Sequence, residues 1–362
     1  MALPRTMAAV LLTGHGGFEA LNYRTDVPVP EPKTGEVLVR VAAAGINNTD
    51  INTRIGWYSK GVTAGTEGGG AGSDAADAGW SGTALTFPRI QGADVCGRIV
   101  AMGEGVDPAR IGERVLVRNM LRTPVGGRPW ECWTLGSDCD GGFAQFVTAP
   151  AVETYAVRCD WSDAELASIP CAFSTAENML HRARLAAERV LVTGASGGVG
   201  SAAVQLAKRR GATVIAVAAE AKAAEVRALG ADRVIARQAD PVALLGADAV
   251  EVVIDVVGGP AMPRLLDLLV RGGRYAVAGA IAGPMAQIDL RTLYLKDLSL
   301  LGCTFQEDEV FASLVSYVEA GAIRPVVART YPLADIVRAQ QDFLSKAHTG
   351  KLVLIPPQVS GA

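Results

Sequence analysis

The pattern of hydrophobic and polar positions changes near residue 160. Before it, short β-branched and aliphatic runs are interrupted by prolines, glycines and charged residues, which is typical of antiparallel β structure. After it, short apolar runs alternate with segments whose apolar residues recur at helical spacing. Alternating strands and helices predict a parallel, doubly wound sheet with helices on both faces. We therefore expect an α/β chain with a β-rich first part.

The elements expected after residue 160 follow from this alternation. Ser162 and Glu165 form a capping box, and a helix is expected from Ala172 to Ala183. The expected strands are 190–193, 213–217, 233–235, 250–255, 273–279 and 298–304. The expected helices are 199–209, 220–229, 241–245, 260–270 and 291–295, with 308–320 and 334–346 in the tail before a closing strand at 351–355. A reversal of strand order in such a sheet creates a cofactor site at the carboxyl ends of the strands.

Two segments of the first part depart from the strand pattern. Residues 49–54 are polar and predict a short helix capped by Asn48 or Thr49. Residues 61–82 contain eight glycines and few large apolar side chains, so they bury too little surface to offset the entropy lost on ordering. We expect a long flexible surface insertion, which either covers the site as a lid or has no role.

The segment from Val190 to Gly200 carries the strongest chemical signal. A buried strand leads into Gly194-Ala195-Ser196-Gly197-Gly198-Val199-Gly200, within which a helix begins. The glycines at 194, 197 and 200, with an extra one at 198, are a relative of the dinucleotide fingerprint. They let the backbone approach a ligand, and the helix N-terminus attracts its phosphates. A tight turn without a ligand is the alternative, but the following strand completes a βαβ unit and favours a dinucleotide.

The end of the strand at 213–217 bears on the choice of nicotinamide cofactor. An acidic residue there would bind the ribose 2′-hydroxyl and select NAD. The strand is followed instead by Ala218 and Ala219, which leave room for a 2′-phosphate, and Lys222 can pair with that phosphate. Against this, Glu220 would repel a phosphate, and Lys222 also fits a solvated residue on a helix. We predict NADPH in preference to NADH.

Composition excludes several classes of function. The 362 residues carry a formal net charge of −3, which argues against a nucleic-acid-binding protein. No apolar run approaches the ~20 residues that a membrane helix needs, and the first residues lack the layout of a signal peptide. The six cysteines show no disulfide-framework spacing. We therefore expect a cytoplasmic protein that acts on a small molecule and binds neither nucleic acid nor membrane.

Four motifs together resemble the medium-chain dehydrogenase/reductase superfamily. They are Gly45-Ile46-Asn47-Asn48-Thr49-Asp50, the glycine turn at 194–200, Leu229-Gly230-Ala231-Asp232 and Leu293-Tyr294-Leu295-Lys296-Asp297-Leu298. The resemblance covers the chain apart from residues 61–86 and points to the zinc-independent quinone oxidoreductase-like and alcohol dehydrogenase-like branch. It implies a GroES-like catalytic domain over 1–160, completed by 305–362, and a Rossmann domain over 161–304.

The resemblance also identifies the positions at which zinc-dependent members hold their metal. These positions are Asn47, Ala93 and Cys171, with Asp94 where a glutamate is usual. A catalytic zinc needs three protein ligands and an open position, and Cys171 alone among these three is a good ligand. The lobe for a structural zinc lacks its four cysteines. We therefore predict no zinc, and hydride transfer to a quinone or activated carbonyl polarised by hydrogen bonds.

The resemblance implies three catalytic candidates. Asn47 matches the asparagine of the quinone reductases and can donate to a carbonyl oxygen, and Tyr58 can donate a proton or a hydrogen bond. Cys171 is expected near the nicotinamide, where a buried inert thiol is the alternative to a nucleophile. Capping is the alternative role for Asn47, and a structural hydrogen bond is expected for Asp50.

The residues expected to bind the cofactor lie on the glycine turn and on neighbouring loops. The family implies that Thr175 bonds the nicotinamide carboxamide. The full set is Thr175, Gly194, Ser196, Gly197, Gly198, Val199, Gly200, Lys222, Gly258 and Gly279. His181 and His348 have no partner pattern nearby and are expected to be structural or exposed.

Three functions remain open, and the first is favoured. It is an NADPH-dependent reductase of quinones or α,β-unsaturated carbonyls without zinc. The alternatives are an alcohol dehydrogenase-like reductase of aldehydes or ketones, and a non-catalytic nucleotide-binding redox sensor. The segment 296–303 resembles the final sheet strand that pairs across a twofold axis in this family, so we expect a homodimer.

Overall fold

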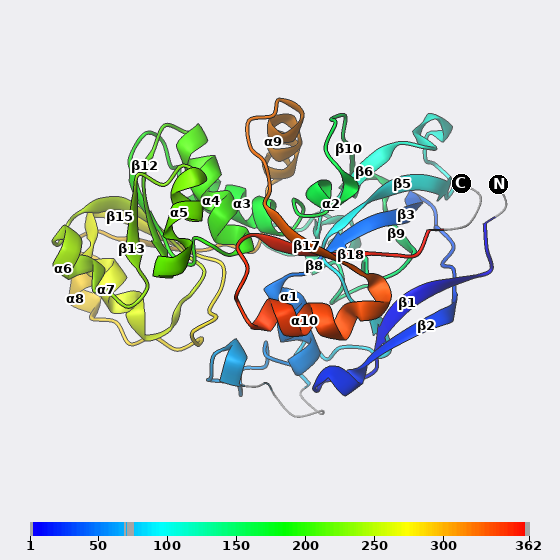
Figure 1. Cartoon of the computed structure of the whole chain (residues 1–362), viewed down its shortest axis with the longest axis horizontal. Coiled ribbons are helices and arrows are strands. Elements are labelled where there is room, and N and C mark those ends of the chain that lie inside the picture. Colours follow the sequence, from blue (N-terminus) through cyan, green and yellow to red (C-terminus); the bar gives the residue numbers. More distant parts are fainter. Residues whose placement is uncertain (1–2, 69, 71–75, 359–362) are drawn as a thin grey trace.

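The computed structural model describes residues 3–68, 70 and 76–358. A unit built around a parallel sheet and a β-rich unit lie side by side (Figure 1). The strands of the parallel sheet are β11 (Arg189–Val192), β12 (Thr213–Ala218), β13 (Arg233–Ala236), β14 (Val250–Asp255), β15 (Leu269–Val277) and β16 (Ser299–Gly302). Their order is β13-β12-β11-β14-β15-β16, and neighbouring strands run parallel. The order reverses between β11 and β14, where a doubly wound sheet binds its ligand.

Helices cover both faces of this sheet because its strands alternate apolar side chains between the faces. The helices are α3 (Ala172–Arg182), α4 (Gly198–Arg209), α5 (Ala223–Ala228), α6 (Pro241–Leu245), α7 (Met262–Asp267) and α8 (Leu290–Leu295). On β11, Val190 and Val192 pack in the cluster formed with α3, α4 and α5. Leu191 between them packs in the opposite cluster, with Leu265 and Leu266 of α7.

The β-rich unit contains strands from both ends of the chain. Its strands are β1 (Thr6–Leu12), β2 (Leu21–Pro28), β3 (Glu36–Gly45), β4 (Arg89–Ile90), β5 (Val95–Met102), β6 (Arg114–Val117), β7 (Met120–Leu121), β8 (Trp133–Thr134), β9 (Phe146–Pro150), β10 (Thr154–Ala156), β17 (Val327–Pro332) and β18 (Lys351–Ile355). The main sheet has the order β10-β6-β5-β3-β18-β17, with β9 also paired to β3. Because β18 pairs antiparallel with β3, the end of the chain joins the sheet that its first part began.

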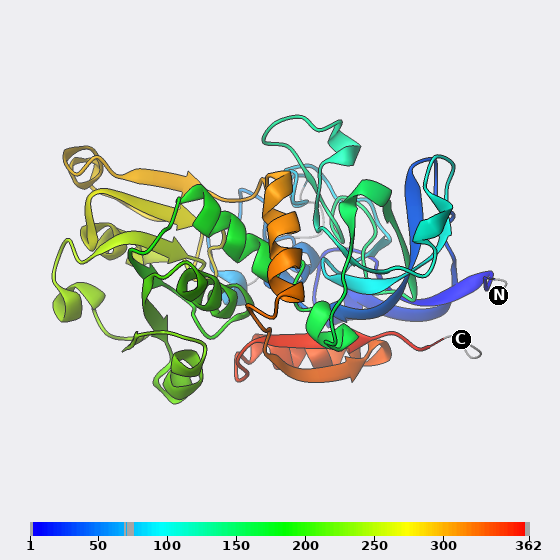
Figure 2. The ribbon, with the colours of Figure 1, turned by 90° about the horizontal axis from the view of Figure 1, so that it is seen from above.

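In the part of the chain that the structure describes, the remaining α-helices are α1 (Asn48–Ile55), α2 (Asp163–Leu166), α9 (Asp308–Glu319) and α10 (Ile336–Leu344). Figure 2 shows α9 standing between the parallel sheet and the β-rich unit. Phe311 and Leu314 of α9 are buried in the same cluster as the apolar face of α3. Among the described residues, no helix combines the length and hydropathy needed to cross a bilayer.

Most expected elements are confirmed, and the differences lie at their ends. The helix expected from residue 220 begins at Ala223 because Glu220–Lys222 form a 3-10 turn. The first short helix is capped by Asn47, not by Asn48 or Thr49 as predicted. Asn47 has an extended backbone (φ −130°, ψ 163°), and its N–H donates to the Asp50 carboxylate, which is one half of a capping box.

The insertion at 61–82 packs more closely than its composition predicts. Thr66 and Ala78 are buried, and the Thr66 N–H donates to the carbonyl of Ile281 at 3.1 Å. A Cβ on Gly65 would lie 2.4 Å from that same carbonyl oxygen, so glycine permits the close approach. Most described residues of the insertion are exposed, as expected for a surface segment. Its flexibility and its role stay predictions, and residues 69 and 71–75 lie outside the described residues.

Candidate functional site

The glycine turn joins β11 to α4 at the reversal of strand order. Gly194 has φ +58°, a conformation that L side chains rarely adopt. A Cβ on Gly200 would lie 2.2 Å from the Gly194 carbonyl oxygen. Gly197 caps α4 and has no side chain to accept from the N–H groups of the first turn. These groups therefore face a position suited to a phosphate, so the turn fits a dinucleotide.

Gly258 and Gly279 follow the neighbouring strands β14 and β15. Gly258 has φ +63°, and a Cβ on Gly279 would lie 2.9 Å from the Val256 carbonyl oxygen. Both glycines are therefore required by the close approach of two loops beside the glycine turn. Their contact with a cofactor stays a prediction.

Buried Asp255 organises this edge of the sheet, although it was not among the residues expected at the site. Its carboxylate accepts from the Thr193 hydroxyl at 2.5 Å and from the Tyr275 hydroxyl, with further bonds from the N–H groups of Val257 and Gly258. Burial and the nearby Asp255 charge raise the pKa of Tyr275, so this phenol donates at every working pH. An acid at the end of β14 is the signal that would have found it.

The segment 346–351 packs beside the glycine turn. The Gly350 N–H donates to the Ser196 carbonyl at 3.0 Å. Lys222 donates through Nζ to the Lys346 carbonyl at 2.6 Å and to the His348 carbonyl. Lys222 thus holds a segment that contacts the glycine turn, and its own contact with a cofactor stays a prediction.

A buried network of charges lies at the start of α1. Lys351 Nζ pairs with Asp94 Oδ2 at 2.9 Å and also donates to Asn47 Oδ1. Asn47 Nδ2 donates to Asp94 Oδ2 at 2.8 Å, and the other Asp94 oxygen accepts from the Cys171 N–H at 2.6 Å. Lys351 is 3% and Asp94 0% exposed. The structure thus connects Asn47 and Cys171 through Asp94. We call these three residues and Lys351 the polar floor.

Burial sets the protonation of the remaining groups at this floor. Burial raises the pKa of Asp50 to about 7, although the Asn47 N–H and the Lys351 charge act in the opposite direction. Burial also raises the pKa of Cys171, and the Asp94 charge adds to the effect. The Cys171 thiol therefore stays protonated near neutral pH, which favours the inert-thiol alternative over a nucleophile. Thr175 lies one turn along α3, and its N–H donates to the Cys171 carbonyl at 3.1 Å.

Tyr58 reaches the same region from beyond the end of α1. Its hydroxyl donates to Thr49 Oγ1 at 3.0 Å, and its ring packs edge-on against Trp80 with 4.7 Å between centroids. Burial raises the pKa of Tyr58, as would charge on the nearby Cys171. Because Thr49 accepts from Tyr58, its own hydroxyl hydrogen can be donated onward. Thr49 is a candidate that the sequence analysis did not single out.

The donor set at this floor does not fit a catalytic zinc. Both ends of the Asn47 amide are hydrogen-bonded within the network, and Ala93 has no ligand atom. The Lys351 ammonium contacts Asp94, so a cation already neutralises the carboxylate that would help to bind a metal. Cys171 alone cannot make up the three ligands that a catalytic zinc requires.

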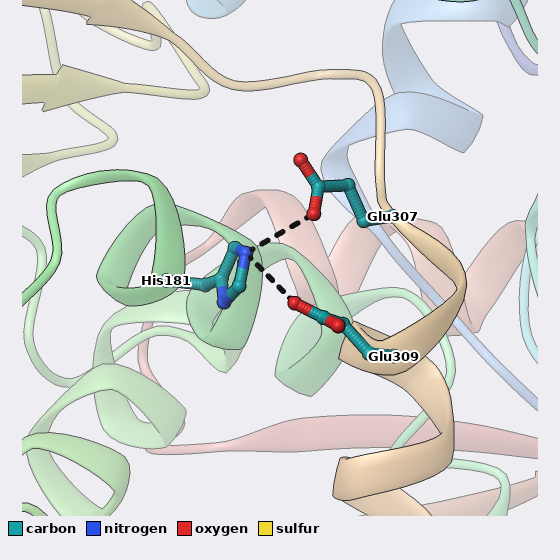
Figure 3. A group of neighbouring side chains, drawn as sticks. All are labelled: His181, Glu307 and Glu309. Atoms are coloured by element: carbon teal, nitrogen blue, oxygen red, sulfur yellow. Dashed lines mark ion pairs between the residues drawn. The ribbon is translucent and has the colours of Figure 1, made fainter.

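A second group of metal-ligand residue types lies at the opposite end of α3. His181 Nε2 lies 3.4 Å from carboxylate oxygens of both Glu307 and Glu309 (Figure 3). Ten residues of helix separate His181 from Cys171, about 15 Å. The expectation that His181 is structural or exposed agrees with this contact, and its two glutamate partners follow only 126 and 128 residues later in the chain. The cluster is an exposed ion-pair group that ties α3 to α9.

Comparisons with known proteins agree with this geometry. Residues 33–158 match the family model "Alcohol dehydrogenase GroES-like domain", and residues 198–320 match "Zinc-binding dehydrogenase". Acryloyl-coenzyme A reductase of Metallosphaera sedula is 31% identical over 96% of this chain and 99% of its own length. The chain belongs to the medium-chain dehydrogenase/reductase superfamily. It is an NAD(P)H-dependent oxidoreductase with a GroES-like domain and a Rossmann-type sheet.

Other members of the superfamily differ in their named activities. Quinone oxidoreductase of Rattus norvegicus is 29% identical over 97% of this chain and 98% of its own length. A crystal structure from Sinorhizobium meliloti 1021, assigned as an alcohol dehydrogenase, is 49% identical with a TM-score of 0.88 and 98% coverage of both chains. The reductase CinF, solved with NADP and 2-octenoyl-CoA, is 25% identical with a TM-score of 0.82, covering 98% of this chain and 88% of its own.

Proposed function

We propose that this chain is an NADPH-dependent reductase of quinones or α,β-unsaturated carbonyls that works without zinc. The observation that carries the proposal is the buried Lys351–Asp94 pair, whose ammonium and carboxylate engage Asn47 at a position where zinc-dependent members hold a metal ligand. Without a Lewis acid, an acceptor that is already activated is the easier substrate. Relatives named as a quinone oxidoreductase and an acryloyl-coenzyme A reductase support this choice.

The residues of the chain would hold the cofactor and polarise the acceptor. The N–H groups at the start of α4 would bind the pyrophosphate beside Gly194 and Gly200. The bound nicotinamide would supply the hydride. Tyr58 donates to Thr49, and the Thr49 hydroxyl can in turn donate to the acceptor oxygen, where charge develops during reduction. In this proposal Tyr58 and Thr49 act as donors, while Asn47 and Cys171 shape the site.

The preference for NADPH is supported by two neighbouring lysines, Lys222 and Lys346, beyond the end of β12. Burial lowers the pKa of Lys346 to about 8, with the Lys222 charge acting in the same direction and the Glu67 charge in the opposite one. Burial lowers the pKa of His348 to about 4, and the charges of Lys222, Lys346 and Lys351 act in the same direction. An added anion would stabilise the charged forms of Lys222 and Lys346, while His348 is neutral near pH 7. Lys222 uses two of its three hydrogens on carbonyls, so one remains for a 2′-phosphate.

A substrate and cofactor panel tests the proposed function directly. Oxidation of NADPH and of NADH is followed with a quinone, an enone, an enoyl thioester and an aldehyde, together with metal analysis of the purified protein. The proposal expects higher kcat/KM with NADPH, with the quinone or enone class, and no stoichiometric zinc. About one zinc per chain would overturn the claim that the enzyme works without zinc. An equal or higher kcat/KM with NADH would overturn the preference for NADPH.

An aldehyde or ketone reductase is the second candidate. It is favoured by the similarity to the Sinorhizobium meliloti protein assigned as an alcohol dehydrogenase. The aldehyde arm of the panel separates the two functions, because turnover confined to aldehydes would replace the first proposal by the second.

A homodimer is proposed from the free edge of the parallel sheet. Strand β16 ends the sheet, and Leu300 on it is 39% exposed. Tyr294 and Leu295 of the adjacent α8 are more than half exposed. A sheet edge with exposed apolar residues is suited to pairing with a second copy across a twofold axis.

A further inference from the structure

The side chain of Lys351 runs from the glycine turn at 194–200 to the polar floor. Its backbone begins β18, where the Lys351 N–H donates to the Val326 carbonyl at 2.8 Å. Its stem passes over the first residue of α4, because a Cβ built on Gly198 would lie 2.9 Å from Lys351 Cδ. Its ammonium then reaches the Ile46 carbonyl at 2.9 Å and the Asp94 carboxylate at 2.9 Å. One side chain therefore contacts the start of α4 and the loop before α1.

This path explains the extra glycine in the cofactor turn. Gly194 needs its positive φ, and Gly200 lies too close to a carbonyl for a Cβ. Gly198 is not among the residues with positive φ, and the nearest obstacles to its Cβ are Lys351 Cδ at 2.9 Å and Ala172 Cβ at 3.4 Å. A lysine stem would ordinarily move aside, but this one is held at both ends. Gly198 is thus required by Lys351 and not by the backbone of the turn.

The charge of Lys351 also fixes the orientation of the Asn47 amide. Asn47 Oδ1 accepts from the ammonium and Nδ2 donates to Asp94. A rotated amide would direct its NH2 group at the ammonium and its oxygen at the carboxylate, and both contacts would be repulsive. The same carboxylate holds the Cys171 N–H at the start of α3. Lys351 therefore sets the position of two floor elements relative to α4.

We propose that Lys351 is a positioning residue that fixes the polar floor relative to the glycine turn. Position 198 is a glycine because a larger side chain would collide with the methylene groups of Lys351. The proposal rests on the proposed function for its kinetic part only. The contact between Gly198 and Lys351 is a statement about the fold and requires neither cofactor nor acceptor.

The first experiment measures the Gly198–Lys351 contact by thermal unfolding. Gly198→Ala is made in the wild type and in a Lys351→Ala/Asp94→Asn double variant. The double variant removes the methylene groups of Lys351, and the asparagine avoids leaving the Asp94 carboxylate buried without its counter-ion. Alanine normally stabilises a helix relative to glycine. We expect Gly198→Ala to lower Tm in the wild type and to raise it or leave it unchanged in the double variant. Gly14→Ala is the control, because its added Cβ has no neighbour within 4 Å and it lies far from the proposed dimer edge in sequence.

The second experiment measures positioning with Lys351→Met and Lys351→Arg. With NADPH and the best acceptor of the panel, we expect Lys351→Met to lower kcat by on the order of tenfold to a hundredfold. The NADPH KM should change much less, and Lys351→Arg should restore most of kcat because it keeps the charge. A residue that served folding alone would alter the amount of active enzyme and leave kcat per active site, titrated with tightly bound cofactor, unchanged.

The two experiments fail in different ways. An equal loss of Tm from Gly198→Ala in both backgrounds would overturn the assignment of Gly198. Wild-type kcat in Lys351→Met would overturn the positioning role. If none of the acceptors supports NADPH oxidation by the wild type, the proposed function fails. The Tm comparison still decides whether Gly198 and Lys351 are in contact. If the double variant does not fold, the kcat comparison of the two single variants decides the positioning role.

Discussion

Replacing Asp50 by asparagine should change how stability depends on pH. Asp50 lies in the first turn of α1, is 2% exposed and accepts from the Asn47 N–H at 2.7 Å. Burial raises the pKa of this carboxyl from 3.8 to about 7 in the folded protein. An asparagine of the same shape keeps an oxygen for the Asn47 N–H but carries no ionisable proton.

The sign and size of the effect follow from proton binding. Between pH 4 and 7 the folded chain keeps the Asp50 proton and the unfolded chain has lost it. The folded state therefore binds more protons, and its stability falls as pH rises through this window. Because each pKa unit is worth about 1.4 kcal/mol, the loss from this group amounts to about 4 kcal/mol by pH 8. Asp50→Asn removes this loss.

Urea unfolding of the wild type and Asp50→Asn at pH 4 to 9 measures the difference. We expect the free energy of unfolding of the variant, relative to the wild type, to rise by up to about 4 kcal/mol between pH 4 and 7 and then to level off. Asp26→Asn is the matched control, since Asp26 is exposed beside Arg24. A difference that is flat, or that falls as pH rises, would mean that Asp50 ionises normally and would refute the reasoning.

Three further predictions address cofactor, donor and assembly. Lys222→Ala should raise the KM for NADPH by about tenfold, since a charged hydrogen bond is worth about 1.5–3 kcal/mol, and leave the KM for NADH unchanged; an equal rise for both would remove Lys222 from the 2′-phosphate site. Tyr58→Phe should lower kcat by about tenfold to a hundredfold by removing the bond to Thr49, with little change in acceptor KM; unchanged kcat in steady-state assays would contradict the donor role. Leu300→Lys should convert the dimer to a monomer in light scattering because it charges the free sheet edge, and a dimer of unchanged affinity would exclude that edge.

The parallel sheet was predictable because its signals are local. Strand β11, the glycine turn and α4 are contiguous, and the apolar residues of each element repeat at the spacing of that element. Their bounds differ from the expected ranges by only one residue at an end. The later helices were displaced where 3-10 turns precede them, as at Glu220–Lys222, because such turns share the polar pattern of a helix start.

The polar floor was only partly predictable because its members are distant in sequence. Asn47, Asp94 and Cys171 were expected at one site from a family resemblance. Lys351 follows Asn47 by 304 residues, and no spacing rule links a lysine at the start of a closing strand to a buried aspartate. The same limit applies to His181, whose glutamate partners belong to another helix. Composition likewise does not reveal which residues of the insertion at 61–82 are buried, such as Thr66 and Ala78.

The pairing of β18 with β3 has a consequence for synthesis of the chain. Strand β3 and Asp94 leave the ribosome hundreds of residues before the strand and the ammonium that complete them. Until then, β3 lacks its partner strand β18 and the Asp94 carboxylate lacks its counter-ion. We therefore expect the polar floor to be completed last during synthesis, after the strands of the parallel sheet have been made. Loss of the final dozen residues would leave a chain that still contains every glycine of the cofactor turn but has no means of completing the site opposite it.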